Sequence, residues 1–192
     1  GGTLAHLYFG ARLEGLSAAN LLRRANVPAD GSFSVQECAL DRLPQEYPSF
    51  GLGDMRDGAL EVEGPDGSWA VDLRVEKAEI LEEKPALEGL PATRGEGSAA
   101  LRVTLRDGHT GLAVILDYAV YDDCPAVTRS VRLINGGDAP LKVTRALSLC
   151  LDLPDDGWEL ITLPGAWGRE RVVCRRPLVA GHQGVSSRRG AS

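Results

Sequence analysis

The sequence has few of the residues that most often carry catalysis or metal binding. It contains three histidines, four cysteines and one methionine in 192 residues, and only 5% of its residues are aromatic. Its cysteines, at positions 38, 124, 150 and 174, form no Cys-x-x-Cys pair and have no histidine at a zinc-ligand spacing, which argues against a zinc site. The irregular spacing also favours reduced thiols over disulfides, so we expect a cytoplasmic protein.

Long apolar runs and basic clusters are missing as well. The longest apolar stretch, Leu112 to Leu116, is far shorter than the roughly 20 residues that cross a bilayer. The formal net charge is -6, and acidic and basic residues are interspersed rather than gathered into a basic stripe. We therefore expect a soluble protein that binds neither membranes nor nucleic acid.

No group of residues in the sequence predicts a catalytic centre. The neighbouring carboxylates Asp122-Asp123 and Asp155-Asp156 stand at turn signals, where solvated turn residues are expected rather than a glycosidase acid and nucleophile. The histidines, at positions 6, 109 and 182, are scattered, and no serine stands in a G-x-S-x-G elbow. Residue chemistry alone leaves the function undetermined.

Period-two alternation, in contrast, is abundant from residue 59 onward. Residues 60–63 and 69–76 flank a Pro-Asp-Gly turn, which predicts a β-hairpin. Residues 101–105 and 112–120 flank a second glycine turn, and the later run is apolar on both faces, which predicts a central strand. After the turn at Asn135-Gly136-Gly137, one long strand is expected from Leu141 to Leu153.

Strands joined by glycine turns, without amphipathic helices between them, predict an all-β antiparallel sandwich. Nearer the start, Leu4, Leu7 and Phe9 suit a strand, and residues 17–25 suit at most one short helix. Residues 43–56 combine two prolines, two aromatics and two glycines without any period, and residues 85–97 form a second expected loop. Loops that a rigid sheet holds in place often carry function.

Several short segments, in order along nearly the whole chain, carry a family resemblance. The most specific are E-Y-P-S-F-G-L-G-D-M-R at residues 46–56 and G-A-W-G-R-E-R at residues 165–171. Weaker ones are L-A-H-L-Y-F-G at 4–10, L-E-G-L-P-A-T at 87–93, D-Y-A-V-Y at 117–121, R-S at 129–130 and R-G-A-S at 189–192. Together they resemble the N-terminal domain of family-36 glycoside hydrolases, the bacterial and fungal α-galactosidases.

The resemblance implies an antiparallel β-supersandwich of the galactose-mutarotase type, with residues 1–192 as a single N-terminal domain. A catalytic (β/α)8 barrel and a C-terminal domain would lie outside this chain. The sequence begins at Gly1 and its only methionine is Met55, so we expect the natural protein to be longer. The resemblance implies that the whole enzyme forms a homo-oligomer and removes terminal α-galactose from melibiose- or raffinose-type sugars with retention of configuration. It needs no cofactor, and its two catalytic carboxylates belong to the barrel.

For the site, the resemblance implies that residues 46–56 reach toward the sugar pocket. Asp54 would accept hydrogen bonds from galactose hydroxyls, and Arg56 would orient Asp54 or contact the sugar; the alternative is a salt bridge that only shapes the loop. Met55 stands where the family often has an aromatic residue. Trp167, Arg169 and Arg171 are expected to pack at a domain interface rather than to contact sugar.

Two other functions remain open at this point. One is an autonomous carbohydrate-binding module, which usually exposes a planar row of aromatic rings, whereas this chain has only 3 Trp, 4 Tyr and 3 Phe. The other is a purely structural interaction domain.

Overall fold

The computed structural model describes residues 2–11, 13–14, 40, 43–89, 92–93, 95 and 97–186. It contains eight strands in these ranges: β1 (Leu60–Glu63), β2 (Leu73–Leu81), β3 (Ala99–Asp107), β4 (Leu112–Val120), β5 (Val127–Asn135), β6 (Lys142–Ala146), β7 (Glu159–Thr162) and β8 (Cys174–Pro177). Every strand pair is antiparallel, and the described residues include no α-helix, which confirms the predicted all-β fold. The helix expected at residues 17–25 lies outside the described residues.

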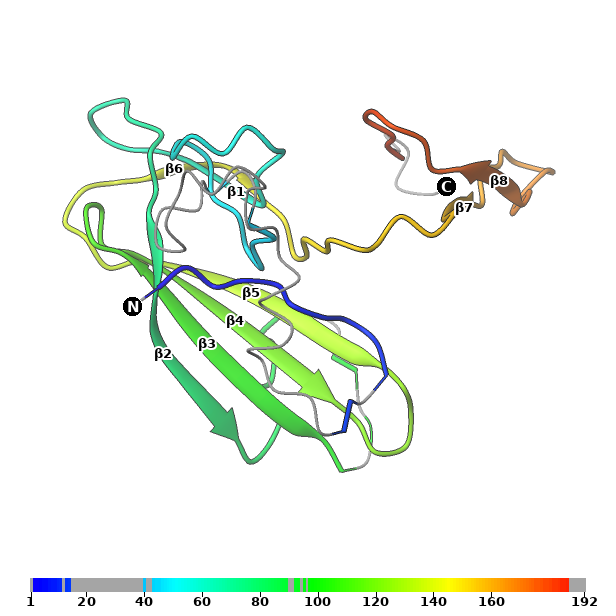
Figure 1. Ribbon diagram of the computed structural model, residues 1–192, viewed down its shortest axis with the longest axis horizontal. Helices are drawn as coiled ribbons and strands as arrows, with labels where there is room; N and C mark the ends of the chain where they lie inside the picture. Colours follow the sequence, from blue (N-terminus) through cyan, green and yellow to red (C-terminus); the bar gives the residue numbers. More distant parts are fainter. Residues whose placement is uncertain are drawn as a thin grey trace, which may run out of the picture. The chain divides into compact units, whose positions relative to one another are not determined.

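The chain divides into two compact units, Gly1–Asp152 and Leu153–Ser192. In the first unit, β2, β3, β4 and β5 form a four-stranded sheet in sequence order, and β1 pairs with β6 in a second sheet (Figure 1). The second unit holds the two-stranded sheet β7–β8. That residues 1–192 form one domain stays a prediction.

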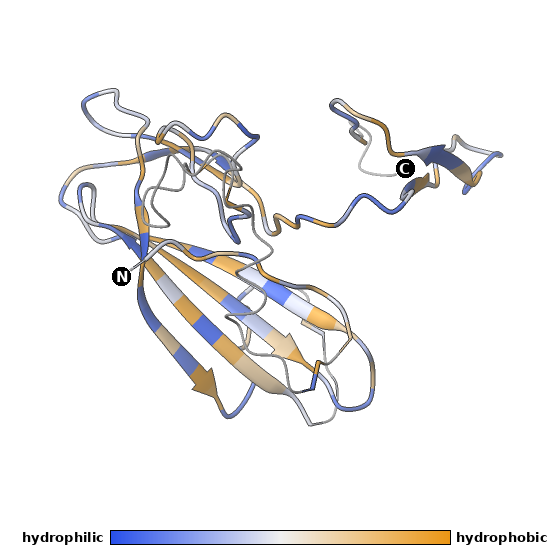
Figure 2. Ribbon diagram, in the orientation of Figure 1, coloured by the Kyte–Doolittle hydropathy of each residue, from blue (hydrophilic) through white to orange (hydrophobic). Residues whose placement is uncertain are grey.

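The core of the first unit lies between its two sheets. Alternate side chains of β3 and β4 point into one buried cluster with side chains of β1, β2 and the preceding loop. Its buried members are Tyr47, Ala59, Leu60, Val62, Val71, Leu73, Val103, Leu105, Leu112, Val114 and Leu116. Alternating hydrophobic and hydrophilic bands run along the strands of the larger sheet, as period-two burial requires (Figure 2).

The β3–β4 hairpin confirms the second predicted turn. Asp107 is buried, and its carboxylate accepts hydrogen bonds from Thr110 N at 2.7 Å and from Asp72 N at 3.0 Å. Gly111, with φ of 75°, closes the turn by donating to the Asp107 carbonyl at 3.1 Å. The predicted central position of residues 112–120 is also correct, because β4 pairs with both β3 and β5.

Three strand predictions are wrong. The Pro-Asp-Gly turn forms, since Gly67 N donates to the Gly64 carbonyl, but the strands on either side of it do not pair with each other. β1 pairs instead with β6, and β2 starts only at Leu73 and pairs with β3. The long strand expected from Leu141 to Leu153 ends at Ala146, which pairs with Leu60, the first residue of β1.

The third error concerns the start of the chain. Residues 2–11 form no strand and make one isolated bridge, between Ala5 and Gln45. This segment runs across the larger sheet: Gly2 accepts a hydrogen bond from Val75 N on β2, and His6 lies beside Glu46 next to β5. Its backbone hydrogen bonds therefore go mainly to the loop at residues 44–46, with one to β2, and do not form a strand ladder.

The second unit has no core of its own among its described residues. None of the residues from 153 to 186 is buried, and Trp158, Trp167, Val173 and Val179 are all exposed. Within the described ranges, no helix has the length and apolar content to cross a membrane.

Because Leu116 is fully buried at the centre of the core, Leu116→Ala should lower the free energy of unfolding by about 2–5 kcal/mol. Ile80→Ala, an aliphatic truncation at an exposed position on edge strand β2, should change it by less than about 0.5 kcal/mol. Urea unfolding of both variants measures the difference. Equal losses in the two variants would contradict the placement of the core.

Candidate functional site

The loop at residues 43–58 is held on both sides by backbone hydrogen bonds. On one side, His6 N donates to the Pro44 carbonyl at 2.7 Å, and Glu46 N donates to the Leu4 carbonyl at 3.0 Å. On the other side, Phe50 N donates to the Leu60 carbonyl at 3.0 Å. The loop predicted from composition is thus an ordered one that is anchored to the first residues of the chain and to β1.

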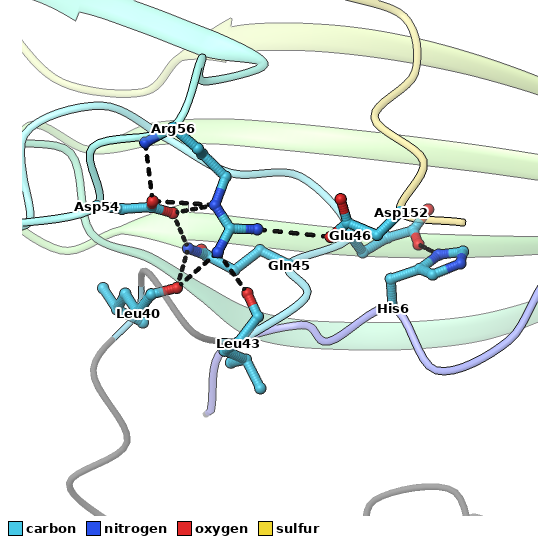
Figure 3. Close-up of polar contacts among 8 residues, drawn as sticks. All are labelled: His6, Leu40, Leu43, Gln45, Glu46, Asp54, Arg56 and Asp152. Atoms are coloured by element: carbon cyan, nitrogen blue, oxygen red, sulfur yellow. Dashed lines mark hydrogen bonds and ion pairs between the residues drawn. The ribbon is translucent and has the colours of Figure 1, made fainter. Parts of the chain in front are cut away.

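Asp54 and Arg56, the two residues predicted for the site, form an ion pair within this loop (Figure 3). Arg56 Nε lies 2.9 Å from Oδ1 and 2.8 Å from Oδ2 of Asp54, and Arg56 N donates to Oδ1 at 3.2 Å. Gln45 Nε2 donates to Oδ2 at 2.7 Å. Asp54 is only 3% exposed, so three protein donors replace the water that its carboxylate loses on burial.

Arg56 also connects chain segments that are far apart in sequence. Its terminal nitrogen Nη2 donates to the carbonyls of Leu40 at 3.0 Å and Leu43 at 2.8 Å. Its other terminal nitrogen, Nη1, lies 3.5 Å from Oδ2 of Asp152. The planar guanidinium suits this role because it presents several donors in fixed directions. Arg56 therefore orients Asp54 and ties the loop to the segment that follows β6.

A second polar cluster, which the sequence did not predict, lies beneath the same loop. Glu46 Oε1 accepts hydrogen bonds from Tyr118 on β4 at 2.7 Å and from Arg129 on β5 at 2.8 Å. Its other oxygen, Oε2, lies 2.7 Å from Nδ1 of His6. Arg129 further donates to the Glu46 carbonyl at 3.3 Å. Three residues separated by as many as 123 sequence positions thus meet at the Glu46 carboxylate, and their spacing in the sequence does not predict this cluster.

Two tyrosines enclose the Arg129 guanidinium. Its carbon lies 5.5 Å from the Tyr47 ring centroid and 5.2 Å from the Tyr118 ring centroid, both within cation–π range. Burial raises the pKa of Tyr47 to about 12, and burial together with the hydrogen bond to Glu46 raises the pKa of Tyr118. Arg129 Nε is the one buried side-chain nitrogen or oxygen atom of the described residues without a hydrogen-bond partner.

The other residues singled out in the sequence do not join this loop. Asp122, Asp123, Asp155 and Asp156 are exposed in irregular segments, as expected for solvated turn residues. Trp167, 97% exposed, stands at a tight turn that Arg169 N closes by donating to the Ala166 carbonyl at 2.8 Å. No three His, Cys, Asp or Glu side chains in the described part of the chain are grouped so as to hold a metal ion.

Comparison with known proteins identifies the family. The model of the glycosyl hydrolase family 36 N-terminal domain matches residues 2–192. The chain belongs to this family. The resemblance drawn from the short segments is thereby confirmed.

Relatives of known activity extend well beyond this chain. It is 42% identical to α-galactosidase AgaA of Geobacillus stearothermophilus and 37% identical to α-galactosidase Mel36A of Lactobacillus acidophilus, in each case over its full length. It spans only 27% of the length of either relative. The chain therefore corresponds to one part of these family 36 proteins.

Solved structures of family 36 members share the fold. A crystal structure of an AgaA variant in complex with stachyose gives a TM-score of 0.85 at 42% identity, covering 98% of this chain and 27% of that one. The α-galactosidase of Lactobacillus brevis gives a TM-score of 0.86 at 32% identity, covering 98% of this chain and 26% of its own. Both chains contain the architecture of this family 36 domain.

Removing the charge of Glu46 should cost far more stability than removing that of an exposed carboxylate. In Glu46→Gln the shape is kept, but Arg129, whose side chain is 6% exposed, loses its counter-ion, so the free energy of unfolding should fall by about 3–5 kcal/mol. The matched control is Glu63→Gln, which breaks an exposed pair with Lys142 and should cost at most about 1 kcal/mol. Thermal and urea unfolding measure both, and a Glu46→Gln loss no larger than the control would refute the importance of this pair.

Proposed function

We propose that the protein containing this chain is a retaining α-galactosidase, in which residues 1–192 belong to a non-catalytic N-terminal domain. The family match over residues 2–192, with 27% coverage of two α-galactosidases, carries this proposal. The acid/base and nucleophile carboxylates of such a reaction would then lie in the remaining length of the protein. The substrates would be α-galactoside oligosaccharides, the class to which the raffinose and stachyose bound to AgaA variants belong.

Exposed apolar side chains support a packing role for this domain. Residues 153–186 bury none of their side chains, and Trp167, Val173 and Val179 are largely uncovered. Exposed apolar surface of this kind marks contact sites. We infer that it packs against the catalytic barrel or a second subunit, and that Trp167, Arg169 and Arg171 belong to that interface. The free thiols of Cys124, Cys150 and Cys174 support a cytoplasmic location.

The loop at residues 43–58 is the proposed contribution to the sugar site. Phe50 and Met55 of this loop are exposed, while the ion pair of Asp54 and Arg56 fixes its shape. Arg56 and Gln45 already donate to both oxygens of the buried Asp54 carboxylate, so a sugar hydroxyl would have to share one of these oxygens with them. A charge-assisted hydrogen bond to that oxygen would contribute about 1.5–3 kcal/mol.

The complete protein should release galactose from raffinose and from p-nitrophenyl α-galactoside with retention of configuration. The 192-residue chain alone should release none, because the proposed carboxylate pair lies elsewhere. Enzymatic galactose assay and NMR of the first-formed anomer measure both properties. Turnover by the purified 192-residue chain, or none by the complete protein, would overturn the proposal.

Substitutions at Asp54 and Arg56 in the complete protein separate sugar contact from loop shaping. If Asp54 accepts a sugar hydroxyl, Asp54→Asn should lower kcat/KM by about ten- to 150-fold, the equivalent of 1.5–3 kcal/mol. Arg56→Ala is the matched control, because it removes the same ion pair but keeps the carboxylate. Asp54→Asn should therefore lose more kcat/KM than Arg56→Ala for the same fall in Tm. Parallel losses in both variants would assign Asp54 to the shape of the loop alone.

A further inference from the structure

A cavity of about 320 Å³ lies on the sheet face opposite the Glu46 cluster. Strand register decides the face: Asp117 pairs with Ser130 and Ala119 pairs with Thr128, and all four residues line the cavity. Tyr118 and Arg129, one residue along each strand, send their side chains to Glu46 on the other face. The small side chains of Ala119, Thr128 and Ser130 leave space on this face. The volume of the cavity is in the range of small-molecule sites.

One wall of the cavity comes from the loop after β2 and is fixed by the protein itself. Lys84 Nζ donates to the carbonyl and to the hydroxyl oxygen of Thr93, each at 2.9 Å. The Thr93 hydroxyl lies 2.9 Å from the Tyr121 hydroxyl, which lies 3.1 Å from the Thr128 hydroxyl on β5. This chain of hydrogen bonds connects the loop to the sheet, so the cavity does not need a ligand to form its wall.

The floor of the cavity carries a carboxylate and hydroxyl groups, and the charge of the carboxylate is balanced by an arginine. Asp117, 7% exposed, receives two parallel hydrogen bonds from Arg102, at 2.7 and 3.0 Å. Each Asp117 oxygen keeps a further acceptor position. The Ser130 hydroxyl makes no hydrogen bond to the described residues, and Pro85, Leu87 and Ala119 add aliphatic surface.

We propose that this cavity binds a neutral polyhydroxylated molecule of monosaccharide size. Hydroxyl groups of such a ligand would donate to Asp117 and exchange hydrogen bonds with Ser130 and Thr128, while its C–H faces would contact Pro85 and Leu87. An apolar ligand would displace water from the Ser130 hydroxyl and from the further acceptor positions of Asp117 without replacing those hydrogen bonds, which is unfavourable. An anion would meet the Asp117 carboxylate, while Lys84 of the lining is already engaged by Thr93 and Arg102 by Asp117. The site lies wholly on this chain and does not depend on the proposed hydrolytic activity.

The test is a titration of the isotope-labelled 192-residue chain with D-galactose, followed by amide NMR signals. We expect shifts at Ala119, Thr128 and Ser130. Ser130→Leu fills the cavity and should weaken binding about tenfold or more. The matched control, Thr104→Leu, stands on the same sheet face by register but outside the cavity lining, and should bind as the unmodified chain does.

A second variant, Thr128→Val, keeps the size of the side chain and removes one hydroxyl, so it serves if Ser130→Leu does not fold. It should weaken galactose binding while leaving the amide spectrum folded. The methyl signals of Ala119 and Thr128 allow the same titration in the complete protein.

Four outcomes would overturn the proposal: no shifts, shifts that persist in Ser130→Leu and Thr128→Val, shifts confined to residues 43–58, or stronger binding of inorganic phosphate than of galactose at the same amides. The third outcome would leave the proposed role of Asp54 standing. Loss of hydrolysis in the complete protein is a separate measurement, so failure of the proposed function and failure of this cavity site are distinguishable.

Discussion

Glu46 and Arg129 place opposite charges where water scarcely reaches, and most of the first unit is arranged around that constraint. A buried carboxylate and a buried guanidinium are tolerated only when they meet with further hydrogen-bond partners. Tyr118 and His6 complete the surroundings of Glu46, and the rings of Tyr47 and Tyr118 cover Arg129. Because these partners come from the N-terminal segment, the loop, β4 and β5, satisfying one charge fixes four parts of the chain together. The ion pair of Asp54 and Arg56 lies eight and ten residues further along the same loop.

The local sequence pattern was sufficient to predict strand pairing where the partner strands are neighbours in sequence. The β3–β4 hairpin and the two-sided burial of β4 follow from alternation and a glycine turn. It was insufficient for β1, whose residues pair with β6 residues 79 to 86 positions away, because nothing in four alternating residues specifies a distant partner strand. A Pro-Asp-Gly turn defines a reversal of the chain, but flanking residues pair only when no better partner competes for their hydrogen bonds, and β6 is that partner for β1.

The candidate site shows the same division. Asp54 and Arg56 are two residues apart in a proline- and glycine-containing loop, so their pairing was foreseeable as one of two alternatives. The further contacts of this pair, with Gln45 and with the carbonyls of Leu40 and Leu43, form only because the loop folds back on itself. The spacing of these residues in the sequence does not predict that fold. The Glu46 cluster was beyond prediction because its members, among them His6 and Arg129, become neighbours only after the sheet has formed.

The location of the buried apolar residues also has a consequence for synthesis. The buried cluster ends at Leu116, and the last partly buried residue packed against it is Cys150, while described residues beyond 152 add nothing to it. A nascent chain therefore has every component of this core once β6 and the residues just after it have left the ribosome. Domains generally fold as units during synthesis, N-terminal first. The first unit is thus suited to fold cotranslationally. Its folding can be completed only after β6, the last strand of the unit, has emerged to pair with β1.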